Sequence, residues 1–342
     1  MAQPTQTTPA TQRPFETAGL TAEQLLGMYE KMLAARLISQ TMLTLQRQGR
    51  IVFAVSCEGH EAAQVASASC LTPGKDWVVP YYRDVGVALA LGMTAKDVML
   101  GAFSRRDDPS SGGRQMACHF SSTKLHILSG SSPVSTQISH AVGVALAAKI
   151  RRQPSVAVAY FGDGAASKGE FHEGLNFAGV HRLPVIFFCE NNDLAISTQA
   201  SKQRAIERLS DRAAAYGFPG VTVDGMDVVE TYVAMKEAVE RARAGHGPTL
   251  VEAKVYRYSP HTSNDDDHRY RTREDVQVAR KRDPIPRLRA QLLDWGVLSE
   301  AQAQDVELRV KQWVETATRE AEQSPPPEPG DATLRVYASG GQ

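Results

Sequence analysis

Two apolar runs of strand length, separated by a segment long enough for one helix, constrain the fold of this chain most strongly. The first run covers residues 156–161 and the second covers residues 183–189. Because both runs are apolar throughout, we expect strands buried on both faces, as in a parallel sheet. A right-handed crossover between parallel strands brings their carboxyl ends to the same edge. The pattern therefore predicts an α/β fold.

The rest of the chain extends this pattern in both directions. Thr21 is a candidate N-cap for a first helix. Apolar periodicity predicts helices at 21–48, 138–150 and 228–243, with helical patterning up to about residue 322, and further strands at 77–82, 220–224 and 249–255. Polar stretches without periodicity predict long loops at 104–133 and 259–275. We expect a central, mostly parallel sheet with helices on both faces.

Composition limits the class of protein. The chain carries 38 basic and 38 acidic residues, so no broad surface for a polyanion is expected and nucleic acid is not a predicted partner. The four cysteines form no C-x-x-C pair, which fits a reducing compartment better than a disulfide framework. No apolar run approaches the roughly 20 residues that span a bilayer, and residues 1–18 lack the features of signal and transit peptides. We therefore expect a flexible tail at 1–18 and a cytoplasmic protein without membrane partners.

Polar residues follow both buried strands at their carboxyl ends, where parallel sheets bind ligands. Gly162-Asp163-Gly164 follows the first strand and Asn191-Asn192 follows the second, with 26 residues, 165–190, between them. Asp163 offers an anionic oxygen, Asn192 offers an amide oxygen, and the next loop can add the carbonyl of Leu194. Three protein oxygens leave room for diphosphate oxygens and water around an octahedral Mg²⁺.

The residues after Asp163 suit a phosphate group. Gly164 and Ala165 have little or no side chain, so their backbone can approach a diphosphate closely. Ser167 followed by Glu170 reads as a capping box, which predicts a helix N-terminus beside the diphosphate.

Alternatives to this interpretation stay open at this point. G-D-G alone is often a tight turn, and an N-N pair alone is often a loop. The spacing Gly162-x-Gly164-x-x-Ser167 is one residue short of a dinucleotide fingerprint, and Glu190 ends the next strand, where a ribose-binding acid can lie. This second hypothesis leaves Asp163 beside a pyrophosphate without a metal and gives Asn191-Asn192 no role.

The spacing from Asp163 to Asn192 resembles the thiamine-diphosphate motif. The segment 162–178 is similar to the α subunits of decarboxylating 2-oxo-acid dehydrogenases, and the resemblance covers roughly residues 20–323. It extends to further short motifs at 59–61, 80–84, 113–116, 131–133 and 258–261. The loop 261–267, followed by Arg269-Tyr270-Arg271, resembles the branched-chain (2-oxoisovalerate) type more than the pyruvate type. A pyruvate or acetoin dehydrogenase, an NAD-binding oxidoreductase and a non-catalytic homologue remain alternatives.

The resemblance implies a three-layer thiamine-diphosphate-binding fold, with one domain at 19–323 and a C-terminal tail at 324–342. It also implies a set of site residues. The Mg²⁺ ligands would be Asp163, Asn192 and the carbonyl of Leu194. The thiamine diphosphate would contact Tyr82, Arg83, Ser132, Val134, Asp163, Gly164, Ala165, Asn192 and His261. The substrate pocket would be lined by Phe53, Tyr82, Met116 and His119, with His119 and His261 as catalytic residues. A monovalent-cation site, for K⁺, would use Ser131, Pro133, Thr136 and Gln137.

Three positions differ from many members of that group. Leu194 replaces a frequent Tyr, Glu190 replaces a phosphate-binding Arg of some members, and Thr262 replaces a regulatory phosphoserine. The resemblance further implies partners. They are a β subunit that completes an α₂β₂ heterotetramer and carries a Glu that contacts the cofactor, a lipoyl-bearing acyltransferase, and a small 2-oxo acid. The small-residue helix at 138–150 is either a subunit contact or a buried internal helix.

Overall fold

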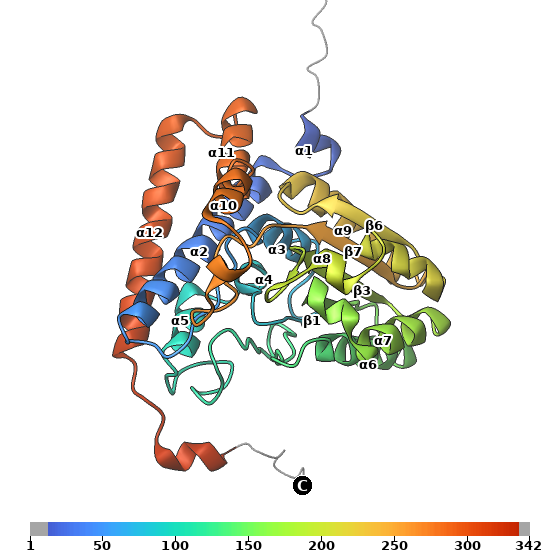
Figure 1. Cartoon of the computed structure of the whole chain (residues 1–342), viewed down its shortest axis with the longest axis horizontal. Coiled ribbons are helices and arrows are strands. Elements are labelled where there is room, and N and C mark those ends of the chain that lie inside the picture. Colours follow the sequence, from blue (N-terminus) through green and yellow to red (C-terminus); the bar gives the residue numbers. More distant parts are fainter. Residues whose placement is uncertain (1–12, 335–342) are drawn as a thin grey trace, which may run out of the picture.

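A five-stranded parallel sheet forms the centre of the computed structural model, which describes residues 13–334 (Figure 1). The strand order is β1-β2-β3-β7-β6, and every neighbouring pair is parallel. The strands are β1 (Trp77–Val79), β2 (Ala157–Gly162), β3 (Val185–Asn191), β6 (Gly220–Asp224) and β7 (Thr249–Lys254). The two apolar runs of the sequence are β2 and β3, adjacent in the sheet, so the predicted parallel α/β fold is confirmed.

Alternate side chains of the sheet enter two separate cores. On one face, the rings of Tyr160 of β2 and Phe188 of β3 pack with their centroids 5.2 Å apart. This face is covered by α3 (Glu61–Ala68) and α9 (Val228–Arg243). On the other face, Phe161 packs against Phe171 of α7 (Gly169–Val180), beside α6 (Thr136–Ile150). Helices therefore cover both faces, as the sequence predicts.

A further layer of helices lies outside α3. It comprises α2 (Ala22–Arg47), α4 (Val85–Leu91), α5 (Ala95–Ala102), α10 (Arg273–Arg280), α11 (Pro284–Asp294) and α12 (Glu300–Gln323). The longest pair, α2 and α12, run side by side (Figure 1). Thr21 caps α2 as predicted, because its hydroxyl accepts the Gln24 N–H at 3.1 Å. No helix in the described part of the chain is long and apolar enough to cross a bilayer.

Several boundaries differ from the sequence-based expectation. The first strand, expected at 77–82, ends at Val79, because Pro80 has no N–H for the ladder. The expected tail 1–18 contains a short helix, α1 (Pro14–Thr17), whose Phe15 is buried against Trp295. Part of the expected tail 324–342 is also ordered against the fold, since Arg106 pairs with Glu328 at 2.6 Å. Residues 1–12 and 335–342 lie outside the described residues.

The small-residue helix α6 is half buried. Ile138, Ala141 and Ala145 face the core, whereas Gly143 and Ala147 lie at the surface. The inner side of α6 packs tightly against α7, since a Cβ on Gly174 of α7 would lie only 2.5 Å from the Ile138 side chain. The internal-helix interpretation therefore holds for one face, and a subunit contact stays a prediction for the other.

Candidate active site

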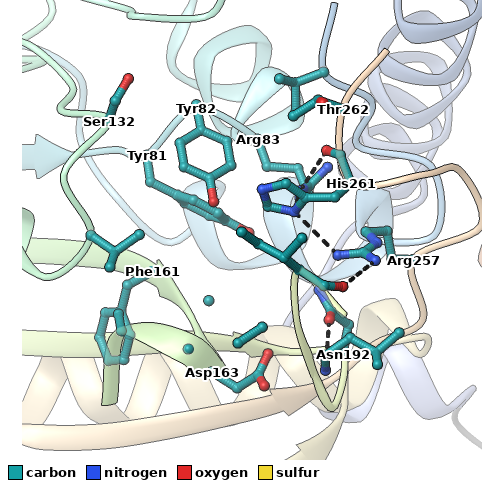
Figure 2. A pocket seen from close by; sticks show the side chains of 18 of the residues that line it. Tyr81, Tyr82, Arg83, Ser132, Phe161, Asp163, Asn192, Arg257, His261 and Thr262 are labelled. Carbon is teal, nitrogen blue, oxygen red and sulfur yellow. Dashed lines mark hydrogen bonds between the residues drawn. The ribbon is translucent and has the colours of Figure 1, made fainter. Parts of the chain in front are cut away.

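A cavity of about 400 Å³ opens at the carboxyl edge of the sheet (Figure 2). Residues that follow four adjacent strands line it: Arg83 after β1, Asp163 after β2, Asn192 after β3 and Arg257 after β7. The predicted meeting of the G-D-G and N-N motifs at one edge is thus confirmed.

The cavity also gathers the other residues that the sequence singles out for cofactor and substrate. Its lining includes Phe53, Tyr82, Met116, His119, Ser132, Val134, Gly164, Ala165, Leu194 and His261. Thr262 and Gln137 line it as well. Ser131, Pro133 and Thr136 lie beside it rather than in its wall. The roles of these residues remain predictions.

Oxygen atoms of Asp163, Asn192 and Leu194 form one part of the cavity wall. Asp163 is buried, which raises the pKa of its carboxyl, and its Oδ2 accepts a hydrogen bond from Gln203 at 3.2 Å. Asp163 is the only carboxylate among the lining residues described. Within residues 13–334, no three His, Cys, Asp or Glu side chains cluster as a metal site. A metal held here by Asp163, Asn192 and Leu194 therefore needs oxygens from a ligand, and a diphosphate supplies them.

The turn after β2 packs closely against the segment that carries Ala195. A Cβ at Gly164 would lie 2.8 Å from the Cβ of Ala195. The predicted capping box is wrong. Residues Asp163–Ser167 form a 3₁₀ turn, Lys168 is extended, and α7 begins only at Gly169 without a side-chain cap. A tight turn rather than the N-terminus of α7 therefore borders the cavity.

Cationic groups form a second part of the cavity wall. The side chains of Arg83 and Arg257 are each 2% exposed, and His261 lies between them (Figure 2). Its Nδ1 is 3.4 Å from Nη2 of Arg83 and 3.2 Å from Nη1 of Arg257. Burial and the two guanidinium groups lower the pKa of His261 to about 3, so its ring is neutral near pH 7. Neither arginine forms an ion pair within the described residues, and Nε of Arg257 has no hydrogen-bond partner. This part of the wall is therefore suited to an anion.

Two residues of the site, Arg257 and Gln203, are not predicted by the sequence analysis. Arg257 lies three residues beyond the end of β7, at the same edge as the two motifs, and this position is a signal that could have indicated it. Gln203 belongs to no motif. It reaches Asp163 only because the loop 193–204 folds back, and its side chain also bonds the carbonyl of Thr198 at 2.7 Å.

The remaining wall is mostly apolar and holds one histidine. Nδ1 of His119 lies 3.1 Å from the carbonyl of Met116 and 3.2 Å from that of Ala117. Because carbonyls only accept hydrogen bonds, Nδ1 carries the proton, and Nε2 accepts from the Ser132 hydroxyl at 2.7 Å. His119 therefore presents an acceptor nitrogen beside Phe53, Met116 and Val134.

The four residues of the expected monovalent-cation site lie together at the start of α6. Gln137 donates to the carbonyl of Ser131 at 2.8 Å, and Thr136 donates to that of Pro133 at 3.0 Å. Oε1 of Gln137 is buried and has no partner. A buried amide oxygen without a hydrogen-bond partner is available to a cation.

The dinucleotide hypothesis loses its support in the geometry. Glu190 does not line the cavity. It is fully buried and lies 2.6 Å from His60, so it cannot bind a ribose as the dinucleotide hypothesis requires.

Comparisons with known proteins show which family the chain resembles. The family model described as "Dehydrogenase E1 component" matches residues 29–330. The chain is 51% identical to the 2-oxoisovalerate dehydrogenase subunit alpha of Bacillus subtilis, over 94% of this chain and 98% of that protein. It is 42% identical to the 3-methyl-2-oxobutanoate dehydrogenase subunit alpha of Mycobacterium tuberculosis, over 89% of this chain and 80% of that protein. It is 40% identical to the pyruvate dehydrogenase E1 component subunit alpha of Staphylococcus aureus, over 89% and 79% of the two chains.

Proposed function

The chain belongs to the dehydrogenase E1 component family, and from this premise we propose that it is the α subunit of the decarboxylating component of a branched-chain 2-oxo-acid dehydrogenase complex. The observation that carries the proposal is the cavity, whose wall combines Asp163 and Asn192 with Arg83 and Arg257, two arginines that form no ion pair within the described residues. The higher identity to a relative named for 2-oxoisovalerate than to one named for pyruvate supports the branched-chain type.

The residues present fit thiamine diphosphate with Mg²⁺. Asp163, Asn192 and the Leu194 carbonyl would hold the metal, while Tyr82, Arg83 and His261 would hold the phosphates. Arg257 would add the cation that the sequence lacks at Glu190. When bound, thiamine diphosphate supplies the nucleophile and the electron sink for decarboxylation of a 2-oxo acid. Ser132 and Val134 would lie beside the aminopyrimidine.

The chain's own contribution to the substrate is an apolar pocket with one polar group. Phe53 and Met116 would contact the side chain of the 2-oxo acid and exclude water from it. His119, with its proton fixed on Nδ1 by two carbonyls, would accept a hydrogen bond or a proton at Nε2. The acyl group would pass to a lipoyl group on the acyltransferase component, and the β subunit would complete an α₂β₂ assembly. A cytoplasmic location remains part of the proposal.

Replacing His119 by Ala tests the pocket. We expect kcat/KM for the 2-oxo acid to fall by about 10²-fold or more, the lower range for a positioned acid–base group. The affinity for thiamine diphosphate should stay within about 3-fold, because His119 lies in the substrate half of the cavity. His140→Ala is the matched control, since His140 is exposed on α6. Wild-type turnover and KM in His119→Ala would remove His119 from the pocket.

The proposed monovalent-cation site has its own test. Exchanging Na⁺ for K⁺ should raise the melting temperature of the wild-type αβ complex, by about 2–4 °C for each kcal/mol of binding free energy. Gln137→Leu should abolish this difference, because it removes the unpartnered amide oxygen. Ser139→Ala, on the exposed side of α6, should keep it. A wild-type complex that is indifferent to K⁺ would argue against the site.

The overall function is tested by calorimetric titration of thiamine diphosphate into the complex co-expressed with its β subunit, with and without Mg²⁺. We expect tight, Mg²⁺-dependent binding, followed by kcat/KM about 10-fold or more higher for 3-methyl-2-oxobutanoate than for pyruvate, as a few apolar contacts can provide. The reverse preference would favour the pyruvate alternative. Absence of binding would favour a non-catalytic homologue, and NAD would then be titrated.

A further inference from the structure

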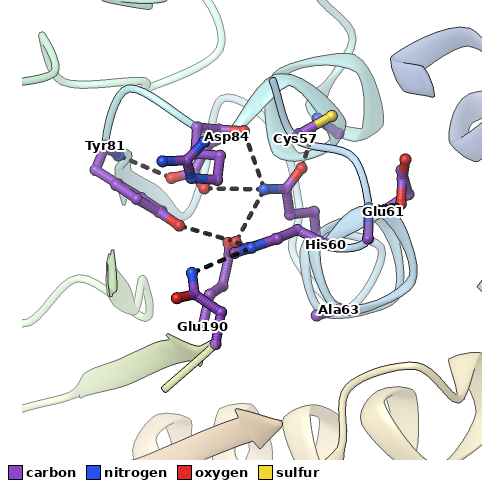
Figure 3. A network of polar contacts seen from close by, with 12 residues as sticks. Cys57, His60, Glu61, Ala63, Tyr81, Asp84 and Glu190 are labelled. Atoms are coloured by element: carbon purple, nitrogen blue, oxygen red, sulfur yellow. Dashed lines mark hydrogen bonds and ion pairs between the residues drawn. The ribbon is translucent and has the colours of Figure 1, made fainter. Parts of the chain in front are cut away.

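Behind Asn192, on the side away from the cavity, lies a chain of buried polar groups that the proposed function does not use. Glu190 and His60 are both fully buried, and Nδ1 of His60 lies 2.6 Å from Oε2 of Glu190 (Figure 3). On its other side, Nε2 of His60 lies 3.4 Å from Nδ2 of Asn192. The order of groups from the interior to the cavity is therefore carboxylate, imidazole, amide.

The hydrogen-bond partners of Glu190 fix which nitrogen of His60 carries the proton. Oε2 of Glu190 also accepts hydrogen bonds from Nε2 of Gln64 at 2.9 Å and from the hydroxyl of Tyr81 at 3.1 Å. Because the Gln64 amide nitrogen can only donate, Oε2 is an acceptor here. Nδ1 of His60 therefore donates to Glu190, and Nε2 is left with a lone pair.

The lone pair selects one end of the Asn192 side chain. An amide has two ends of similar size, of which one donates hydrogen bonds and the other binds cations. Nε2 of His60 attracts Nδ2 and repels Oδ1. Rotation of the amide by half a turn would place two lone pairs opposite each other in a buried setting. Oδ1, which accepts the Leu194 N–H at 3.1 Å, is thereby kept on the side of the loop that carries Leu194.

We propose that His60, oriented by Glu190, is a positioning residue that holds the Asn192 amide with its oxygen toward the divalent-cation site. This inference rests on the proposed function, since it presumes that Asn192 is a metal ligand. It extends to an asparagine ligand the arrangement in which a carboxylate orients a metal-binding histidine. The pair is not isolated, because Glu190 also shares a hydrogen bond with the carboxyl of Asp84, whose pKa is raised by burial and by the Glu190 charge.

The test uses the full αβ complex and measures how thiamine diphosphate binding depends on Mg²⁺ concentration, by calorimetry, together with the melting temperature. His60→Leu should raise the Mg²⁺ concentration for half-saturation about 10–100-fold, the usual loss for a group behind a metal ligand. Saturating Mg²⁺ should restore cofactor affinity and kcat. His60→Gln, whose amide can both donate to Glu190 and accept from Asn192, should stay within about 3-fold of wild type by the same reasoning.

Two further variants separate positioning from folding. The double variant His60→Leu, Glu190→Leu removes the buried carboxylate together with its histidine partner and should fold, yet it should show the same loss of Mg²⁺ affinity. Tyr160→Phe removes a buried hydrogen bond to Ser67 of α3, 3.0 Å long, without touching Asn192. It should lower the melting temperature and leave the Mg²⁺ dependence unchanged.

The outcomes distinguish this inference from the proposed function. A wild-type complex that binds no thiamine diphosphate overturns both. If the wild-type complex shows Mg²⁺-dependent binding and the folded double variant needs the same Mg²⁺ concentration for half-saturation, only the role of His60 is overturned. An equal Mg²⁺ shift in Tyr160→Phe would also overturn it, because general destabilisation would then account for the effect.

Discussion

Asn in place of Asp163 should strongly weaken the Mg²⁺-dependent binding of thiamine diphosphate to the αβ complex. Asp163 is the one carboxylate in the described lining of the cavity, and Asn keeps its shape while removing the charge. Loss of a group behind a metal ligand costs about 10–100-fold in metal affinity. Loss of the only charged direct ligand should therefore cost at least about 100-fold. Turnover should fall with cofactor occupancy and recover in part at high Mg²⁺.

The measurement is calorimetric titration of the cofactor at several Mg²⁺ concentrations, in Asp163→Asn and in a matched control. Asp193→Asn is the control, because Asp193 stands between Asn192 and Leu194 in the chain but pairs with Arg204 and Lys254 and does not line the cavity. It has φ of 61°, a conformation that Asn tolerates well. Similar losses of cofactor affinity in both variants would show that binding depends on negative charge near the site and not on Asp163 in particular. Unchanged affinity in Asp163→Asn would remove the metal assignment.

The isolated α chain should decarboxylate 2-oxo acids at least about 100-fold more slowly than the αβ complex. Activation of the cofactor needs an acid–base group at the aminopyrimidine, a class of group worth about 10²–10⁴-fold in rate. The described cavity has no carboxylate free for this role, since Asp163 would be held by the metal. Two apolar side chains of the cavity lining, Met116 and Ile196, are each 54% exposed, which suits coverage by a partner.

This expectation is checked by titrating purified β subunit into a fixed amount of α chain and measuring decarboxylation with an artificial electron acceptor. Activity should rise with added β and level off near equal amounts of the two chains. The control is the same titration with Asp163→Asn, in which β should associate without restoring the rate. Full activity of α alone would refute the requirement for a partner.

Some parts of the site could be predicted from sequence because they depend on chain order alone. The strand lengths of β2 and β3 and the helix between them place Asp163 and Asn192 at one edge in any right-handed crossover. The capping box failed because the same short pattern also permits a 3₁₀ turn, and packing of Gly164 against Ala195 favours that turn. A local pattern is a weak guide where tertiary contacts choose between two local structures.

Other parts could not be predicted because they depend on contacts between distant segments. His60 and Glu190 are 130 residues apart in the chain and meet only when α3 packs on the sheet. The sequence alone presents Glu190 either as a candidate ribose ligand or as the residue that replaces a phosphate-binding arginine of some family members. Its actual surroundings exclude the ribose role, since it faces the interior, and the buried arginine in the cavity wall is Arg257, three residues beyond β7.

The unpaired guanidinium groups beside His261 also bear on how long the protein survives in a cell. Two buried positive charges without counter-ions oppose the folded state until an anion binds between them. Cofactor supply then acts on abundance as well as on catalysis, because a ligand present at 100 times its Kd adds about 2.7 kcal/mol to folding stability. Chains that are made while thiamine is scarce would unfold more often and be degraded sooner, so the amount of this subunit would follow the vitamin status of the cell.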